Sequence, residues 1–124
     1  MKTLLISKQD VSEIIDIKDV IPAVEKGYSV FNAGKVIQPP YMGINIPDST
    51  GSIDFKAGYC AENELISLKA SSGGFVDNPI KYNIPANLGT VLLFDSKSCA
   101  LICVMDGSLV TGYRTGAAGA VSIK

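Results

Sequence analysis

The spacing of apolar residues along the chain changes twice, and each change marks a new kind of element. In the first forty residues, after a short apolar strand, large side chains recur every three or four positions, as on one face of a helix; they are Val20, Val24, Tyr28 and Phe31. This pattern predicts a helix from near Lys18 to Gly34 that packs on a core. Ser7 and Asp10 form the capping signal of a shorter helix that runs through Ile15.

From residue 41 to residue 106 the apolar period shortens to that of strands separated by turns. The strands expected here are Tyr41–Ile46, Ser52–Cys60, Leu65–Ser71, Thr90–Asp95 and Cys99–Met105. Because the connections are short, consecutive strands should pair in an antiparallel meander. Residues 91–94 are apolar on both faces. This indicates a central strand, covered by the helix on one side and by another element, such as a partner subunit, on the other.

Residues 108–124 form a third pattern, in which small side chains cluster between Gly116 and Ala120. We expect a helix here that approaches its neighbours closely because it lacks bulky side chains. Neither a Gly cap nor a Pro follows it before Lys124, so further sequence is expected beyond this point. Together the patterns predict a single α+β domain over residues 1–124. In it, an antiparallel meander packs against N-terminal helices and a small-residue helix ends the domain.

Composition narrows the class of protein and its partners. The chain is 47% apolar and 19% charged, which is typical of a globular domain. Its net charge is −1 and it has no basic cluster, which excludes a nucleic-acid interface. No apolar run approaches the length of a membrane helix, and the first residues do not resemble a signal peptide. A soluble, cytoplasmic protein is therefore expected, without a membrane partner.

Several common chemistries are excluded by residue content. The chain contains no His, which removes Ser-His and Cys-His mechanisms within it and leaves no imidazole for a metal site. Cys60, Cys99 and Cys103 are expected to pack in the core as small hydrophobes. Glu62 and Glu64 fall in a predicted turn, where carboxylates usually face solvent. The glycines form neither a dinucleotide fingerprint nor a P-loop, so no nucleotide site is expected within the chain.

Three charged residues stand out because apolar or small residues flank them: Asp54, Lys69 and Arg114. Such charges are rarely buried unless they are paired. Each is consistent with a structural salt bridge or with a ligand-binding role, and the residues alone leave both interpretations open.

Three blocks near the end of the chain carry a family resemblance: Gly89–Asp95, Ala100–Gly107 and Val110–Ala118. They read as an apolar strand ending in Phe-Asp, a second strand with a Met-Asp-Gly turn, and a helix opening with Thr-x-x-Arg-Thr. This order and spacing resemble the ornithine cyclodeaminase/mu-crystallin family. The Pro39-Pro40 link and the Leu68-Lys69 pair occur in the family's order upstream, so the resemblance covers essentially the whole chain.

The resemblance implies a longer protein with two domains. An N-terminal domain of this kind binds an amino-acid substrate and forms a homodimer through its sheet. A Rossmann domain that binds NAD or NADP follows it and carries the family's catalytic acid/base Asp. This chain would then contain no catalytic residue, bind no cofactor alone and be inactive alone.

The resemblance also implies a substrate site. The family clamps the substrate carboxylate with an Arg after the Pro-Pro link, a Lys on the middle strand and the Arg that opens the last helix. The second and third correspond to Lys69 and Arg114, and Thr115 would lie near the cofactor. The first is replaced by Tyr41, whose phenol offers one hydrogen bond and no fixed charge.

Two further positions depart from the family pattern. Asp54 lies where cyclodeaminases have a Glu near the substrate, and Lys56 replaces a Met. Lys56 would restore the missing cation if it points inward. Both departures move the implied substrate away from ornithine itself.

A cyclodeaminase would transfer hydride from the substrate Cα to the nicotinamide, attack the resulting imine with the distal amine and release ammonia, which converts ornithine to proline. An amino-acid dehydrogenase or ketimine reductase of the same family is a second interpretation. In both, Lys69 and Arg114 would orient the substrate carboxylate. A third interpretation is a binding or dimerisation module without catalysis, like the mu-crystallins.

Overall fold

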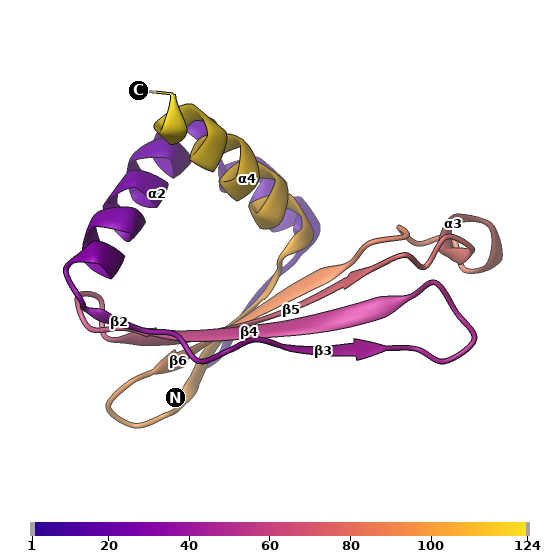
Figure 1. Ribbon diagram of the computed structural model, residues 1–124, viewed down its shortest axis with the longest axis horizontal. Helices are drawn as coiled ribbons and strands as arrows, with labels where there is room; N and C mark the ends of the chain where they lie inside the picture. Colours follow the sequence, from indigo (N-terminus) through magenta and orange to yellow (C-terminus); the bar gives the residue numbers. More distant parts are fainter. Residues whose placement is uncertain (1, 124) are drawn as a thin grey trace.

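A sheet of seven strands runs through the computed structural model, which describes residues 2–123 (Figure 1). The strands are β1 (Leu4–Ile6), β2 (Val36–Ile37), β3 (Met42–Asn45), β4 (Ser52–Cys60), β5 (Leu65–Gly73), β6 (Gly89–Asp95) and β7 (Leu101–Asp106). Their order is β1-β7-β6-β5-β4-β2, and β3 also pairs with β4. The strand predicted at residues 91–94 thus lies inside the sheet, between β5 and β7.

The predicted meander is correct for the strands from β3 to β7, each of which pairs antiparallel with the next. The description of the whole sheet as antiparallel is wrong, because β1 lies parallel to β7, with Leu4 opposite Cys103. Strand β2 adds a short antiparallel pair on β4. The pairing of β1 with β7 joins the two ends of the chain, and a local apolar period contains no information about such a contact.

The helices are α1 (Lys8–Ile14), α2 (Ile17–Asn32), α3 (Asn78–Lys81) and α4 (Ser108–Ser122). The predicted capping signal is confirmed: the Ser7 hydroxyl accepts the Asp10 N–H at 3.1 Å, and the Asp10 carboxylate accepts the Ser7 N–H at 2.9 Å. Helix α2 ends just before Gly34, whose φ of +75° suits a residue without a side chain. None of the described helices is long and apolar enough to span a membrane.

The predicted packing of the second helix is wrong. Helix α2 contacts α4 rather than lying across the sheet, and both helices stand on the same side of the sheet (Figure 1). Val30 is only 7% exposed, whereas Tyr28 is 51% and Phe31 55% exposed. Ala117 of α4 is fully buried, because small side chains let this helix approach its neighbours closely. The apolar period located α2 but not the partner that covers it.

The cysteines divide between core and surface. Cys103 is buried in β7 and Cys60 is half-buried. Cys99 is exposed, with φ at +59° in the turn between β6 and β7, so the prediction that it packs in the core is wrong. The turn itself, rather than the apolar residues that follow it, decides the environment of Cys99.

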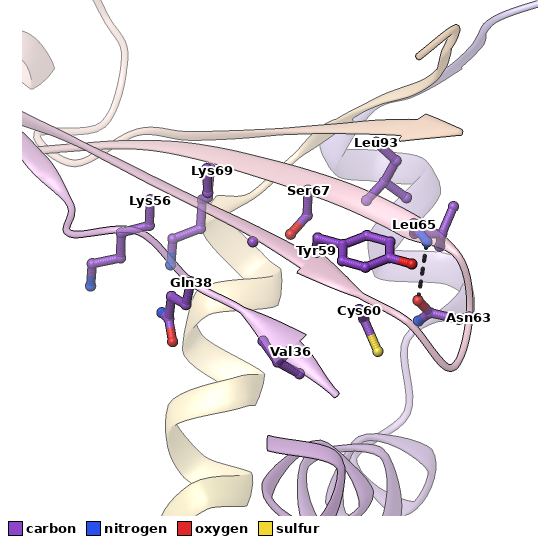
Figure 2. Close-up of a pocket in the computed structure, with 12 residues that line it drawn as sticks. Val36, Gln38, Lys56, Tyr59, Cys60, Asn63, Leu65, Ser67, Lys69 and Leu93 are labelled. Carbon is purple, nitrogen blue, oxygen red and sulfur yellow. Dashed lines mark hydrogen bonds between the residues drawn. The ribbon is translucent and has the colours of Figure 1, made fainter. Parts of the chain in front are cut away.

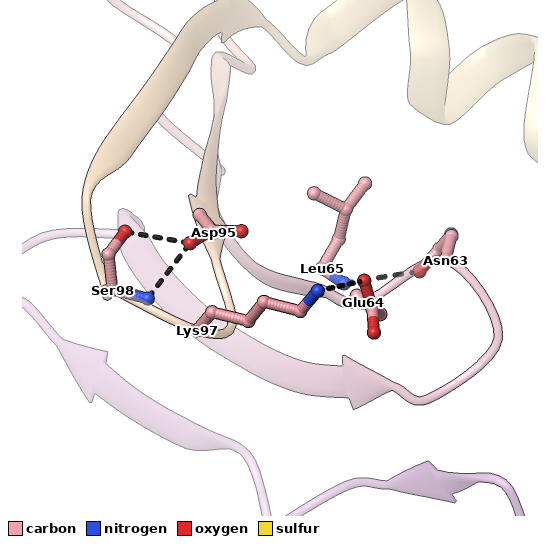
Figure 3. A network of polar contacts seen from close by, with 6 residues as sticks. All are labelled: Asn63, Glu64, Leu65, Asp95, Lys97 and Ser98. Atoms are coloured by element: carbon pink, nitrogen blue, oxygen red, sulfur yellow. Dashed lines mark hydrogen bonds and ion pairs between the residues drawn. The ribbon is translucent and has the colours of Figure 1, made fainter. Parts of the chain in front are cut away.

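Two turns meet at one end of the sheet and fix the ends of four strands (Figure 3). The Asp95 carboxylate accepts the Ser98 N–H at 2.8 Å and the Ser98 hydroxyl at 2.7 Å, and these bonds lower the pKa of Asp95. Lys97 in the same turn pairs at 3.3 Å with Glu64, from the turn between β4 and β5. Glu62 also forms an ion pair, with Lys26 of α2. Both glutamates therefore have structural partners at the surface, in agreement with their predicted place in a turn.

Candidate functional site

Strand alternation places three charged residues on the sheet face that carries α4. Asp54 and Lys56 are two residues apart on β4, so their side chains leave the same face. In the pairing of β4 with β5, Lys56 lies directly opposite Lys69. The amine of Lys69 donates a hydrogen bond to the hydroxyl of Thr111 in α4, at 3.1 Å. This contact fixes which face of the sheet the charges occupy.

The hydrogen bond to Thr111 orients the Lys69 amine at the start of α4. The Thr111 hydroxyl donates to the carbonyl of Gly107 at 2.8 Å, which leaves its oxygen as the acceptor for Lys69. Arg114 lies three residues after Thr111, on the same side of the helix. The described structure therefore brings Lys69 and Arg114 to one region, although they are far apart in the sequence.

The charge of Lys69 has an unfavourable environment. Burial lowers the pKa of Lys69, and the positive charges of Arg114 and Lys56 lower it further. The ion pairs between residues 2–123 use other lysines, namely Lys26, Lys81 and Lys97. Neither Lys69 nor its two cationic neighbours is neutralised by a carboxylate of the described chain. A structural salt bridge, left open by the sequence, is thus not what Lys69 and Arg114 form here.

A cavity of about 350 Å³ opens beside this group of cations (Figure 2). Its lining includes Val36, Gln38, Lys56, Ser67, Lys69 and Leu93. Figure 2 shows Lys56, Lys69 and Gln38 with their polar ends close to one another at one end of the cavity. A second hollow shares Gln38 and Lys56 and extends along Pro39, Pro40 and Tyr41. The cavity therefore combines two amines with two side-chain amides, two hydroxyls and several apolar side chains.

Tyr41 and Lys56, the two departures from the family pattern, contact each other. The Lys56 amine lies 5.7 Å from the centre of the Tyr41 ring, within the range of a cation–π interaction. Tyr41 itself is 64% exposed. The phenol ring thus supports a cation on the neighbouring strand instead of supplying one.

Asp54 and Thr115 lie outside the lining of the cavity. The Asp54 carboxylate sits over the backbone of Gly43 in β3, so that a methyl group at position 43 would be 2.8 Å from Oδ1. Thr115 is exposed and donates its hydroxyl hydrogen to the Thr111 carbonyl at 2.8 Å. Arg114 is also absent from the lining of either hollow and is exposed. Its link to the site is the electrostatic interaction with Lys69.

Comparison with known proteins decides the family. The sequence profile of the ornithine cyclodeaminase/mu-crystallin family matches residues 1–124, the whole chain. This chain belongs to that family. Reductases, dehydrogenases and cyclodeaminases are all represented among its relatives.

Three solved structures illustrate the similarity. The iminosuccinate reductase of Paracoccus denitrificans in complex with NAD+ is 28% identical, with a TM-score of 0.88 over 98% of this chain and 37% of its own. The Δ1-pyrroline-2-carboxylate reductase of Thermococcus litoralis, in complex with NADH and L-proline, is 31% identical, with a TM-score of 0.86 over 94% of this chain and 36% of its own. An archaeal alanine dehydrogenase dimer with bound NAD is 25% identical, with a TM-score of 0.85 over 96% of this chain and 35% of its own. The chain spans little more than a third of the length of each.

In this ornithine cyclodeaminase/mu-crystallin family member, a side chain already caps the start of α4. At the start of α4, where a pyrophosphate would meet a helix N-terminus, the Asp106 carboxylate already accepts the Ser108 N–H at 3.2 Å and the Ser108 hydroxyl at 2.8 Å. A fixed carboxylate there repels phosphate. The meander also lacks the βαβ unit of a dinucleotide fold.

Sequence reasoning missed several polar residues of this family member's site, among them Gln38, Ser67 and Thr111. Thr111 was detectable, because it begins the Thr-x-x-Arg motif and three-residue spacing puts it on the same side of the helix as Arg114. Ser67 was also detectable, because it lies two residues before Lys69 on β5 and so faces the same side of the sheet. Gln38 lies in the link after β2, and only the tertiary fold brings it to the cavity.

Proposed function

We propose that this chain is the substrate-binding and dimerisation part of an NAD(P)-dependent protein that acts on an amino or imino acid. Lys69 and Arg114 bind the substrate carboxylate. The observation that supports this most strongly is the state of Lys69: a half-buried amine, held by Thr111 and facing two other cations, with no carboxylate partner in the described chain. A bound carboxylate would remove that unfavourable charge and gain charge-assisted hydrogen bonds.

The role of this site is to bind and orient. The Thr111 hydroxyl holds the Lys69 amine on α4, and Arg114 one turn further along supplies a planar fork suited to a carboxylate. A carboxylate held at two points fixes the carbon next to it, which is the carbon whose redox state changes in this family. The hydride chemistry belongs to a nicotinamide dinucleotide bound by another part of the full-length protein.

A reductase or dehydrogenase is favoured over an ornithine cyclodeaminase by Lys56. Its positive charge lies directly across the strand pair from Lys69 and lines the same cavity. The second amine of a diamino acid is also positive and would be repelled there. Asp54, the one carboxylate whose family counterpart lies near the substrate, faces Gly43 outside the cavity lining.

The opposite face of the sheet is proposed to bind a second copy of the chain. It presents alternating apolar residues of neighbouring strands, among them Ile44, Ile53, Phe55, Leu68 and Leu92. The helices α2 and α4 lie on the other side of the sheet (Figure 1). A solved relative is described as a dimer. Sedimentation of the chain at high concentration should give the mass of a dimer, and a monomer would contradict this part of the proposal.

The enzymatic proposal is tested with the protein expressed from its complete gene. We expect oxidation of NADH or NADPH with a 2-oxo acid plus ammonia, or reduction of NAD(P)+ with an amino acid, but no release of ammonia with formation of proline from ornithine. Lys69→Met and Arg114→Met should each lower kcat/KM about 100-fold, because each removes one partner of a charge-assisted contact. Lys8→Met, an exposed lysine of α1, is the matched control and should change little.

The outcome also separates catalysis from the non-catalytic interpretation. If the complete protein turns over none of a panel of amino and imino acids, and Lys69→Met leaves its ligand binding unchanged, the enzymatic proposal is wrong. The protein would then act as a binding or dimerisation module.

A further inference from the structure

The pairing of Lys56 with Lys69 is unusual for a sheet. Like charges directly opposite each other on neighbouring strands destabilise the pair, and in this register the two lysines are direct partners. Burial lowers the pKa of Lys69 most, the charge of Arg114 follows, and the charge of the exposed Lys56 lowers it further. A stable sheet gains nothing from this arrangement.

No carboxylate of the described chain offsets the pair. Asp54, two residues before Lys56 on the same face, lies over Gly43 and forms no ion pair with either lysine. The Tyr41 ring, 5.7 Å from the Lys56 amine, stabilises the cation without neutralising it. Two positive charges, from Lys56 and Arg114, therefore act on the charge of Lys69.

A single carboxylate accounts for two of these cations. Under the proposed function, on which this inference rests, Lys69 and Arg114 hold the carboxylate next to the reacting carbon. Lys56 is then left over, although it lines the same cavity and also the neighbouring hollow toward Tyr41. A substrate with one acid group leaves this third charge unpaired.

We propose that the site selects a small amino or imino acid with a second acid group, and that Lys56 binds the distal carboxylate. Lys56 is thereby the residue that determines specificity, with Tyr41 as a positioning residue behind it. Gln38 and Ser67 line the cavity and supply neutral hydrogen bonds for the same group. The cavity of about 350 Å³ lies at the small end of the range for ligand pockets, which favours a short diacid.

The test compares two substrates that differ by one carboxylate. The protein expressed from its complete gene is assayed for NADH or NADPH oxidation with oxaloacetate plus ammonia and with pyruvate plus ammonia. We expect kcat/KM for the diacid to exceed that for the monoacid at least tenfold. Lys56→Met should lower the ratio of the diacid value to the monoacid value at least tenfold. Lys56→Arg should retain most of the preference, because it keeps the charge.

Tyr41→Leu and a control variant sharpen this test. Tyr41→Leu should weaken the diacid preference two- to fivefold through KM, with kcat nearly constant, because it removes support for the cation but not the cation. Lys8→Met removes one lysine from α1, outside the cavity lining, and should leave both substrates unchanged. Equal rates for the two substrates, or an equal loss of both in Lys56→Met, would overturn the inference and leave the proposed function standing.

A binding measurement covers the case in which neither substrate is turned over. Calorimetric titration with succinate and with propionate should show tighter binding of succinate, lost in Lys56→Met. If that holds without turnover, the diacid site stands and the enzymatic proposal falls. If succinate and propionate bind equally, or neither binds, the diacid site is disproved. Inorganic phosphate is titrated in parallel, and tighter binding of phosphate than of succinate would also contradict a dicarboxylate site.

Discussion

The two faces of the sheet use the same strands for different purposes. On β4, Asp54 and Lys56 face the side that carries α4, whereas Ile53 and Phe55 face the opposite side. On β5, Lys69 faces the side that carries α4 and Leu68 faces the opposite side. One face gathers Lys56 and Lys69, which form no ion pair within residues 2–123, and the other gathers apolar residues on the side away from α2 and α4. The two faces therefore differ in the chemistry that they offer: the first presents amines and the second presents apolar side chains.

Breaking the apolar face should have the largest effect. Phe55→Asp places a charge among apolar residues of neighbouring strands, and we expect loss of the dimer with a decrease of about 3–5 kcal/mol in the free energy of unfolding. Sedimentation velocity and chemical denaturation measure the two effects. Lys56→Asp, one residue along the same strand but on the other face, is the control and should leave the dimer intact. Dimers that survive Phe55→Asp would place the interface elsewhere.

Helix α4, on the charged face, tests the packing of small residues. Ala117 is fully buried, so Ala117→Leu should overpack the helix and cost about 1–3 kcal/mol of stability. At the adjacent Gly116, an added methyl group meets no atom within 4 Å. Gly116→Ala should therefore stabilise the helix by about 0.5–1 kcal/mol. Thermal unfolding should give a lower melting temperature for Ala117→Leu and a higher one for Gly116→Ala. Shifts of both melting temperatures in the same direction would refute this contrast.

The smallest effect concerns the pH dependence that Lys69 confers. Because its pKa is lowered in the folded chain, the unfolded chain holds this proton more tightly. The charged Lys69 destabilises the folded chain, and this destabilisation is fully present below the lowered pKa. The free energy of unfolding should therefore rise as pH increases from there toward the ordinary value of 10.5. Lys69→Met should remove that rise, as denaturant titrations at several pH values would show. An unchanged pH profile would mean that Lys69 is not desolvated.

Local features of the fold were predictable from the sequence, and long-range ones were not. The capping box of Ser7 and Asp10, the end of α2 before Gly34 and the meander all depend on residues close in sequence. The parallel pairing of β1 with β7 and the packing of α2 on α4 depend on distant contacts. The exposure of Cys99 was missed because its left-handed backbone belongs to the turn before it.

Some features of the site were likewise predictable from the sequence, and others were not. Lys69 and Arg114 were selected from their apolar or small neighbours, but their proximity depends on the tertiary contact that the Lys69–Thr111 hydrogen bond makes between β5 and α4. The contact between Tyr41 and Lys56 was not predictable from either residue alone, since it depends on the pairing of β3 with β4. Asp54 was expected near the substrate, and its position over Gly43 follows from the same pairing.

Titration of the Lys69 amine by NMR tests the central claim most directly. In the complete protein with isotopically labelled lysine, the pKa of Lys69 should lie below its ordinary value without ligand and rise when succinate is added, because a bound carboxylate favours the charged amine. The NMR signal of the exposed Lys8 should not change when succinate is added. A pKa of Lys69 that does not move at saturating succinate would contradict the assignment of this amine to a carboxylate site.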